Sequence, residues 1–397
     1  MKKKKIVSTL LALLLFAGLP VSALAATWDI GNGDITVNAG SGGQTVTQGS
    51  QVDVPDDAPV ITGSSDEHSV TINAEKDQTA NVTLSGVNID TSTEDKAAVS
   101  TNGEGNVSIE LDGENTLKSD EGHAGLEKNN GGKLTIADKD KNGKLTAEGG
   151  KYGAGIGGGD KGNGSDIAIT GGEVKATGGY GGAGIGGGKE GAGSGITISG
   201  DAKVNATGGK RSAGIGGGDD GSGRDIEITG GKVTASSKNA GAGIGGGDEG
   251  NGEDITITGG EVKASSENVG AGIGGGYKGD GKRIKITDGT VDAASDKGAG
   301  IGGGDDGNGE NIAISGGKVT AKSSKNGAGI GGGYGAKNNS NSTGNQITIK
   351  SNENGSPTIN AVGGGTDEGE KIVIGGAGIG AGCESDADAD ITLEGKV

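Results

Sequence analysis

Acidic side chains recur directly after a glycine-rich motif, AGIGGG, that returns about every 29 residues. Two successive copies are followed by carboxylates at the same positions: Asp219, Asp220, Asp225, Asp248, Glu249 and Asp254. If the copies stack as neighbouring strands do, equivalent carboxylates lie about 5 Å apart. Carboxylates this close repel unless a cation or a base lies between them, and oxygen clusters suit calcium. The six residues are therefore candidate Ca²⁺ ligands, with a solvated acidic rim partly neutralised by Arg224 as the alternative. We expect no cofactor to be required.

Tyrosines are the second group of side chains that could bind a ligand. Proteins that bind carbohydrate usually present aromatic rings, because a flat π face desolvates the apolar side of a sugar. The residues of this kind are Tyr152, Tyr180, Tyr277 and Tyr334. Tyr277 and Tyr334 occupy the same position two repeats apart, about 10 Å in a stack of strands. They are candidate carbohydrate-binding residues, with chance decoration of a turn as the alternative, and Trp28 is predicted to plug an N-terminal cap.

Catalytic chemistry has little support in the pattern. His68 and His123 are isolated in the sequence, and no repeat carries a polar cluster of its own. The GxGxxG match that begins at Gly153 recurs without the helix that a nucleotide-binding motif requires. The spacing also differs from the nine-residue repeats that bind calcium in β-rolls. We expect a protein that is not an enzyme.

The repeat itself defines the elements that must position these side chains. Isoleucine returns to one register in seven copies of the motif: Ile156, Ile185, Ile215, Ile244, Ile273, Ile301 and Ile330. Each repeat contains two further alternating pairs, such as Ile167/Ile169 and Val174/Ala176. Period-two alternation places the aliphatic residues on one face of a strand, and Gly-rich corners separate the strands. Each repeat therefore holds three short strands.

Three short strands in every 28 to 30 residues predict an all-β fold, a right-handed single-stranded parallel β-helix, or β-solenoid, of about eleven coils. A single coil cannot bury its aliphatic residues, whereas stacked coils share a thin continuous core. The seven isoleucines are predicted to form a structural ladder in that core.

The chain divides into four segments. Residues 1–25 have a basic start, an apolar run and a small-residue end, which is typical of a secretory signal peptide. Residues 26–81 are predicted to form an N-terminal cap and irregular first coils, and residues 82–336 the regular β-helix. Residues 337–397 are predicted to form irregular last coils, in which a truncated piece of a longer protein is one interpretation.

Composition and charge bear on the partners and the cellular location of the protein. Without Lys2 to Lys5 of the signal segment, the formal net charge falls from −18 to −22, which disfavours nucleic acid as a partner. No second apolar run follows the first, so no membrane span is expected. Cys383 is the only cysteine, so no disulfide framework is available within the chain. We expect a secreted or cell-surface protein that is a monomer or part of a longer surface protein.

Several strings resemble a family of exported bacterial β-helix proteins. They are VTLSGVNID from Val82, LDGENTLKS from Leu111, HAGL from His123, GKLTA from Gly143, and GAGIGGG. The family is named carbohydrate-binding after a cellulose- and pectate-binding member. The resemblance implies a non-catalytic right-handed parallel β-helix related in shape to pectate lyases, with calcium and acidic polysaccharide as candidate ligands.

The sequence thus favours a β-helix that binds a cell-wall or plant-type polysaccharide without cleaving it. A structural stalk or adhesin-like spacer is the alternative. A polysaccharide lyase with its site in the irregular ends is a third interpretation.

Overall fold

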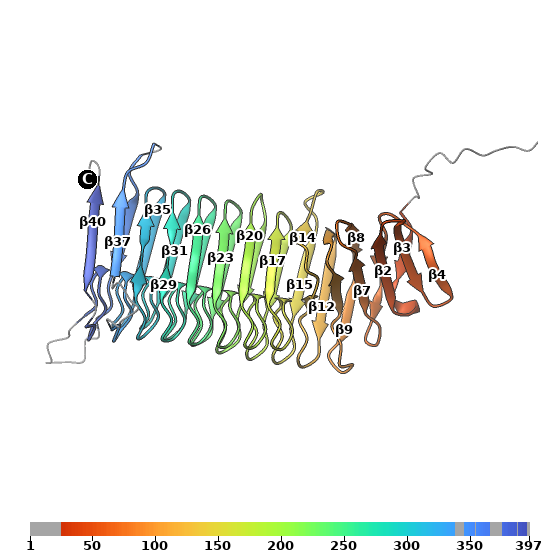
Figure 1. Ribbon diagram of the computed structural model, residues 1–397, viewed down its shortest axis with the longest axis horizontal. Coiled ribbons are helices and arrows are strands. Elements are labelled where there is room, and N and C mark those ends of the chain that lie inside the picture. Colours follow the sequence, from red (N-terminus) through yellow and green to blue (C-terminus); the bar gives the residue numbers. More distant parts are fainter. Residues whose placement is uncertain (1–24, 338–344, 354, 366–374, 387, 395–397) are drawn as a thin grey trace, which may run out of the picture.

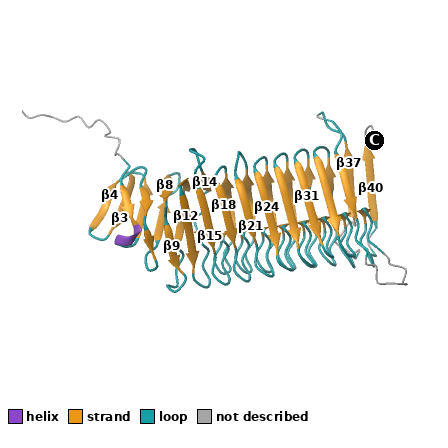
Figure 2. Ribbon diagram, turned by 180° about the vertical axis from the view of Figure 1, so that it is seen from behind, coloured by secondary structure: helices purple, strands orange, loops and turns teal. Residues whose placement is uncertain are grey.

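The computed structural model describes residues 25–337, 345–353, 355–365, 375–386 and 388–394. Most of the predicted signal peptide lies outside these residues. The described chain forms one long rod in which the strands of successive coils lie side by side, from the N-terminal cap to the last coils (Figure 1). Its one helix is the 3₁₀ helix η1 (Ile30–Asn32) at the N-terminal end (Figure 2). No helix in the described part is long and apolar enough to cross a membrane.

Three sheets run along the rod, and each coil contributes a strand or a strand pair to each sheet. Sheet A contains β1 (Thr27–Asp29), β5 (Val60–Thr62), β8 (Thr79–Ser85), β11 (Asn106–Asp112), β14 (Leu134–Ala137), β17 (Gly164–Ile169), β20 (Gly193–Ile198), β23 (Gly223–Ile228), β26 (Gly252–Ile257), β29 (Gly281–Lys282), β30 (Lys285–Ile286), β33 (Gly309–Glu310), β34 (Ile312–Ile314), β37 (Asn345–Lys350) and β40 (Ala389–Glu394).

Sheet B contains β4 (Gln51–Pro55), β3 (Gly43–Gln48), β2 (Ile35–Gly40), β7 (Val70–Ala74), β10 (Val99–Gly103), β13 (Leu126–Lys128), β16 (Ile156–Gly157), β19 (Ile185–Gly186), β22 (Ile215–Gly216), β25 (Ile244–Gly245), β28 (Ile273–Gly274), β32 (Ile301–Gly302), β36 (Ile330–Gly331) and β39 (Ile379–Gly380). From β16 onward these strands have two residues each.

Sheet C contains β6 (Ser64–Ser65), β9 (Asn88–Thr91), β12 (Glu114–Ser119), β15 (Lys144–Glu148), β18 (Glu173–Thr177), β21 (Lys203–Thr207), β24 (Lys232–Ser237), β27 (Glu261–Ser266), β31 (Thr290–Ser295), β35 (Lys318–Ser323) and β38 (Thr358–Val362). Successive coils pair in parallel in all three sheets, and the fold is a right-handed parallel β-helix with three strands per coil, as predicted.

Columns of like residues form the core. The seven isoleucines of the repeated motif are fully buried and pair with one another across sheet B. Each is followed by a glycine with a positive φ; Gly245, for example, has φ 133°, and a Cβ there would lie 2.0 Å from the carbonyl oxygen of Gly274. Only glycine allows successive coils to approach this closely at this position.

Antiparallel strands close the N-terminal end. β3 pairs antiparallel with both β2 and β4, unlike the parallel pairs of the coils. The side-chain amide of Gln44, on β3, accepts a hydrogen bond from the backbone N–H of Asn81 and donates one to the backbone carbonyl of Asn81. Gln44 thus pairs with backbone groups of β8 in sheet A. Trp28 is 3% exposed, and its indole N–H donates to Asp56 at 2.9 Å. Trp28 thus lies inside the cap rather than on a binding surface.

Candidate functional site

Two turns meet beside each short strand of sheet B. One connects sheet C to sheet B and precedes AGIGGG, and the other follows the motif toward sheet A. The residue after each motif donates its backbone N–H to the carbonyl of the first turn in the preceding coil, as in Asp248 to Arg211 at 2.7 Å and Tyr334 to Lys297 at 3.1 Å. We call the surface formed by these paired turns the turn edge. It brings together two columns of variable residues that lie on either side of the motif in sequence.

All four tyrosines lie on the turn edge. Tyr152 and Tyr180 belong to the first turn of their coils, whereas Tyr277 and Tyr334 directly follow the motif, with Asp305 between them in the same column. Tyr180 is the most exposed, at 48%. The hydroxyl of Tyr334 donates to Glu384 at 2.6 Å, and this contact raises the pKa of Tyr334 to about 12.

The carboxylates nearest the middle of the turn edge surround an arginine. The Nε of Arg211 lies 2.7 Å from Asp248 and 3.1 Å from Asp219, and its guanidinium lies 3.8 Å from Asp220. Asp219 and Asp248 are buried. Burial raises the pKa of Asp219 to about 6, although Arg211 acts in the opposite direction. A basic side chain therefore lies where the sequence suggested a cation.

The other predicted calcium ligands have different surroundings. Glu249 pairs with Lys278 at 2.9 Å, and Asp254 pairs with Arg283 at 2.7 Å. Asp225 is exposed and forms no ion pair in the described part of the chain. Within that part, no group of three or more His, Cys, Asp or Glu side chains could hold a metal ion. The neutralising arginines are Arg211 and Arg283, because Arg224, which the sequence suggested, forms no ion pair with any described residue.

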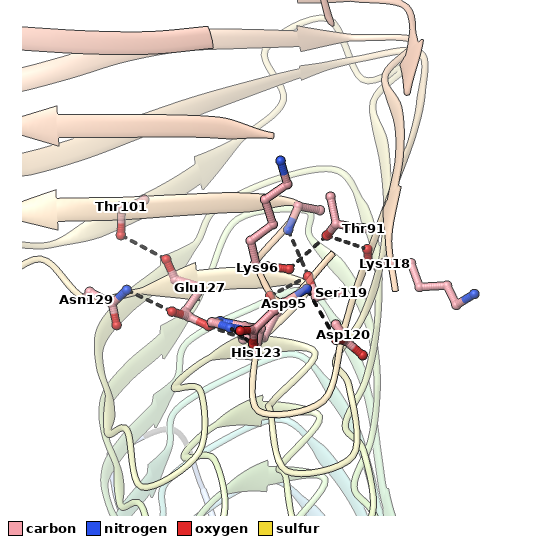
Figure 3. A network of polar contacts seen from close by, with 12 residues as sticks. Thr91, Asp95, Lys96, Thr101, Lys118, Ser119, Asp120, His123, Glu127 and Asn129 are labelled. Carbon is pink, nitrogen blue, oxygen red and sulfur yellow. Dashed lines mark hydrogen bonds and ion pairs between the residues drawn. The ribbon is translucent and has the colours of Figure 1, made fainter. Parts of the chain in front are cut away.

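The coil around His123 contains a polar cluster that the sequence did not predict (Figure 3). The imidazole Nδ1 of His123 lies 2.9 Å from Glu127, and its Nε2 lies 3.7 Å from Asp95. Glu127 is 8% exposed and also accepts from Ala124 N–H and from the side-chain amide of Asn129. His123 is therefore not isolated, and the expectation that no repeat carries its own polar cluster is wrong. A visible signal was Glu127 at the position of Gly157 in the next coil.

A longer turn between sheets A and C lines a shallow groove of about 240 Å³. Lys141 in this turn forms an ion pair with Asp201, two coils further along the rod, at 2.6 Å. Lys144, also in the groove's lining, pairs with Glu114 at 3.0 Å. Two of the groove's three lysines are therefore paired within the chain, and none of the predicted site residues lies there.

Comparison with known proteins agrees with the architecture. A family described as "Beta helix repeat" matches residues 141–160, 167–189, 196–219, 226–248, 255–277, 284–305 and 312–334. No curated protein and no solved structure matches the chain. The first match covers strands of sheets C and B, and each of the other six covers strands of sheets A, C and B. Every match ends at the residue directly after AGIGGG, so the matched repeats correspond to coils of the structure. Residues 141–334 are thus similar in sequence to β-helix repeats, in agreement with the parallel β-helix of the described chain.

Proposed function

We propose that this protein binds polysaccharide through the turn edge without cleaving it, as a secreted or cell-surface β-helix. The observation that carries the proposal is the gathering of all four tyrosines on this one edge of the rod. Stacked coils place equivalent positions at about the strand spacing, so Tyr277 and Tyr334, two coils apart in one column, lie about 10 Å apart. A polymer with its own repeat is the natural ligand for such a surface.

The two halves of the turn edge differ in the side chains that lie beside their tyrosines. In the N-terminal half, Lys151 and Lys189 lie over the ring of Tyr152, at 4.6 Å and 5.2 Å from its centre. In the C-terminal half, Tyr277 lies beside Ala240, whose carbonyl accepts its backbone N–H, and Asp305 lies in the same way beside Val269. The half around Tyr277 thus combines aromatic, apolar and carboxylate groups, the usual components of a sugar-binding surface.

Binding without catalysis is favoured by what surrounds the titratable groups. The Arg211 cluster and the His123 cluster are each held by contacts within the chain, and a catalytic acid or base must instead reach the substrate. We therefore expect incubation with pectate to produce no unsaturated products detectable by ultraviolet absorbance. Such products would show that the protein is a lyase.

Retention on a glycan array, with and without calcium, tests the binding function. Replacing both Tyr277 and Tyr334 by Ala should abolish retention. Tyr152→Ala should change it less, because two lysines of the chain lie over that ring and only one lies over the ring of Tyr277. Failure of the native protein to retain any acidic, neutral or amino-sugar glycan would contradict the proposal and favour a structural spacer.

A further inference from the structure

The rings of the turn edge already bind ammonium groups from the chain itself. Lys151 and Lys189 contact the ring of Tyr152, and Lys278 lies 4.8 Å from the centre of the Tyr277 ring. A cation over an aromatic face is attracted by the negative charge of the π system. The edge is therefore suited to ligands with a positive charge.

A buried carboxylate lies between the two tyrosines of the C-terminal half. Asp305 is 7% exposed and forms no ion pair with any described residue, in contrast to Asp219 and Asp248 around Arg211. Burial raises the pKa of Asp305 to about 6, and the charge of Asp306 acts in the same direction, whereas Lys297 and a hydrogen bond from the backbone of Asp306 act against it. A buried carboxylate that forms no ion pair is costly, and a ligand that brings a positive charge into contact with it would lower that cost.

The surrounding turns reinforce this preference. Between the AGIGGG copies at Ile273 and Ile330, the turn edge carries Asp296, Asp305 and Asp306, and Glu384 lies beyond Tyr334. Opposing them are Lys278, Lys297 and Lys325. Lys278 is paired with Glu249 and Lys325 with Asp296, which leaves Asp305, Asp306 and Glu384 against Lys297. The local field therefore attracts cations and repels acidic polymers.

We propose that Tyr277, Asp305 and Tyr334 form a subsite for a free amino group of an amino-sugar polymer. This inference rests on the proposed function and names the class of its ligand. The ammonium would lie against a tyrosine face and beside the Asp305 carboxylate, while sugar rings would extend over Val269 and the neighbouring turns. The acidic polysaccharide that the sequence resemblance implied is not the preferred ligand of this subsite.

Calorimetric titration near neutral pH, with β-linked glucosamine oligomers and their N-acetylated counterparts of equal length, tests the proposal. We expect the free-amine oligomer to bind about five-fold more tightly or better. Asp305→Asn should remove this preference, and Tyr277→Leu should weaken it. Asp160→Asn is the matched control, because this exposed carboxylate occupies the same column near Tyr152 and its loss changes the net charge equally.

The outcomes separate the inference from the function on which it rests. Equal binding of the two oligomers, or equal losses in Asp305→Asn and Asp160→Asn, would overturn the amino-group subsite and leave polysaccharide binding intact. Absence of binding to these oligomers and to every glycan of the array would overturn both. Thermal melting of each variant shows whether a loss of binding reflects unfolding instead.

Discussion

The coil around His123 and the regular coils close the same turn with different atoms. In the regular coils the backbone N–H of the motif alanine donates to a glycine carbonyl four residues later, as from Ala154 to Gly158 at 2.9 Å. In the His123 coil the equivalent N–H, of Ala124, donates to the side chain of Glu127 at 3.0 Å. A carboxylate therefore replaces a backbone carbonyl, and the coil gains a buried charge.

The difference also shows why glycine fills the motif. Glu127 pairs with Gly157 of the next coil, yet it does not share that residue's positive φ. Its carboxylate occupies space that only a glycine leaves open, because a Cβ at Gly159 would lie 2.9 Å from Glu127 Oε2. The side chains in the turn of the His123 coil thus fit because the next coil has glycines at the facing positions.

The largest expected effect comes from charging the core that both kinds of coil share. Ile244→Asp places a carboxylate at a fully buried position, which should cost several kcal/mol and abolish cooperative melting by circular dichroism. Thr256→Asp is the control, because this neighbouring residue faces outward on β26. Comparable losses in the two variants would contradict the assignment of Ile244 to the core.

The next largest effect compares equivalent substitutions in the turn of a regular coil and in the turn of the His123 coil. Gly245→Ala adds a Cβ at a positive φ, 2.0 Å from a backbone oxygen, and should lower the free energy of unfolding by about 2 to 4 kcal/mol. Glu127→Ala, at the same position of the irregular coil, adds no clash and should cost about 1 to 3 kcal/mol through lost hydrogen bonds. Chemical denaturation measures both. A larger loss in Glu127→Ala would reverse this view of the two turns.

Asp305, a buried carboxylate that forms no ion pair with any described residue, should make the stability of the protein depend on pH. The folded-state pKa of Asp305, about 6, lies above the value of 3.8 for a free side chain, so the folded state binds this proton more tightly. Its contribution to stability is therefore present at acid pH and falls as the pH rises through about 6. Asp305→Asn should be more stable than the native protein by on the order of 2 kcal/mol at neutral pH. The melting temperatures should converge toward pH 4, and a constant difference would contradict this pKa.

The smallest effect concerns the arginine that occupies the suggested cation site. Arg211→Gln should destabilise the protein by about 1 to 2 kcal/mol, since the pair is partly exposed. Calcium should then raise the melting temperature of the variant but not of the native protein, because only the variant leaves Asp219 and Asp248 without a base. Stabilisation of the native protein by calcium would instead support the metal site suggested by the sequence.

The sequence was sufficient to predict the β-helix because its buried columns repeat. A single register error would move isoleucines to the surface, so the period alone specifies the strands and their stacking. The same logic placed Tyr277 and Tyr334 in one column. It could not pair Arg211 with Asp248, because the two lie on opposite sides of a motif and meet only when one coil is stacked on the next. The His123 cluster was missed because it departs from the repeat, and attention to Glu127 in place of glycine would have found it.

The antiparallel N-terminal cap has a consequence for how the rod folds. β2 and β3 form a local hairpin, which can close before any coil exists, whereas every parallel pair must await a complete turn of chain. Because a chain is synthesised from its N-terminus, the hairpin is available first, and β7 can add to the free edge of β2. Each later coil then finds a ready template in the one before it. The architecture therefore favours folding that starts at the N-terminal cap and adds one coil at a time toward the last coils.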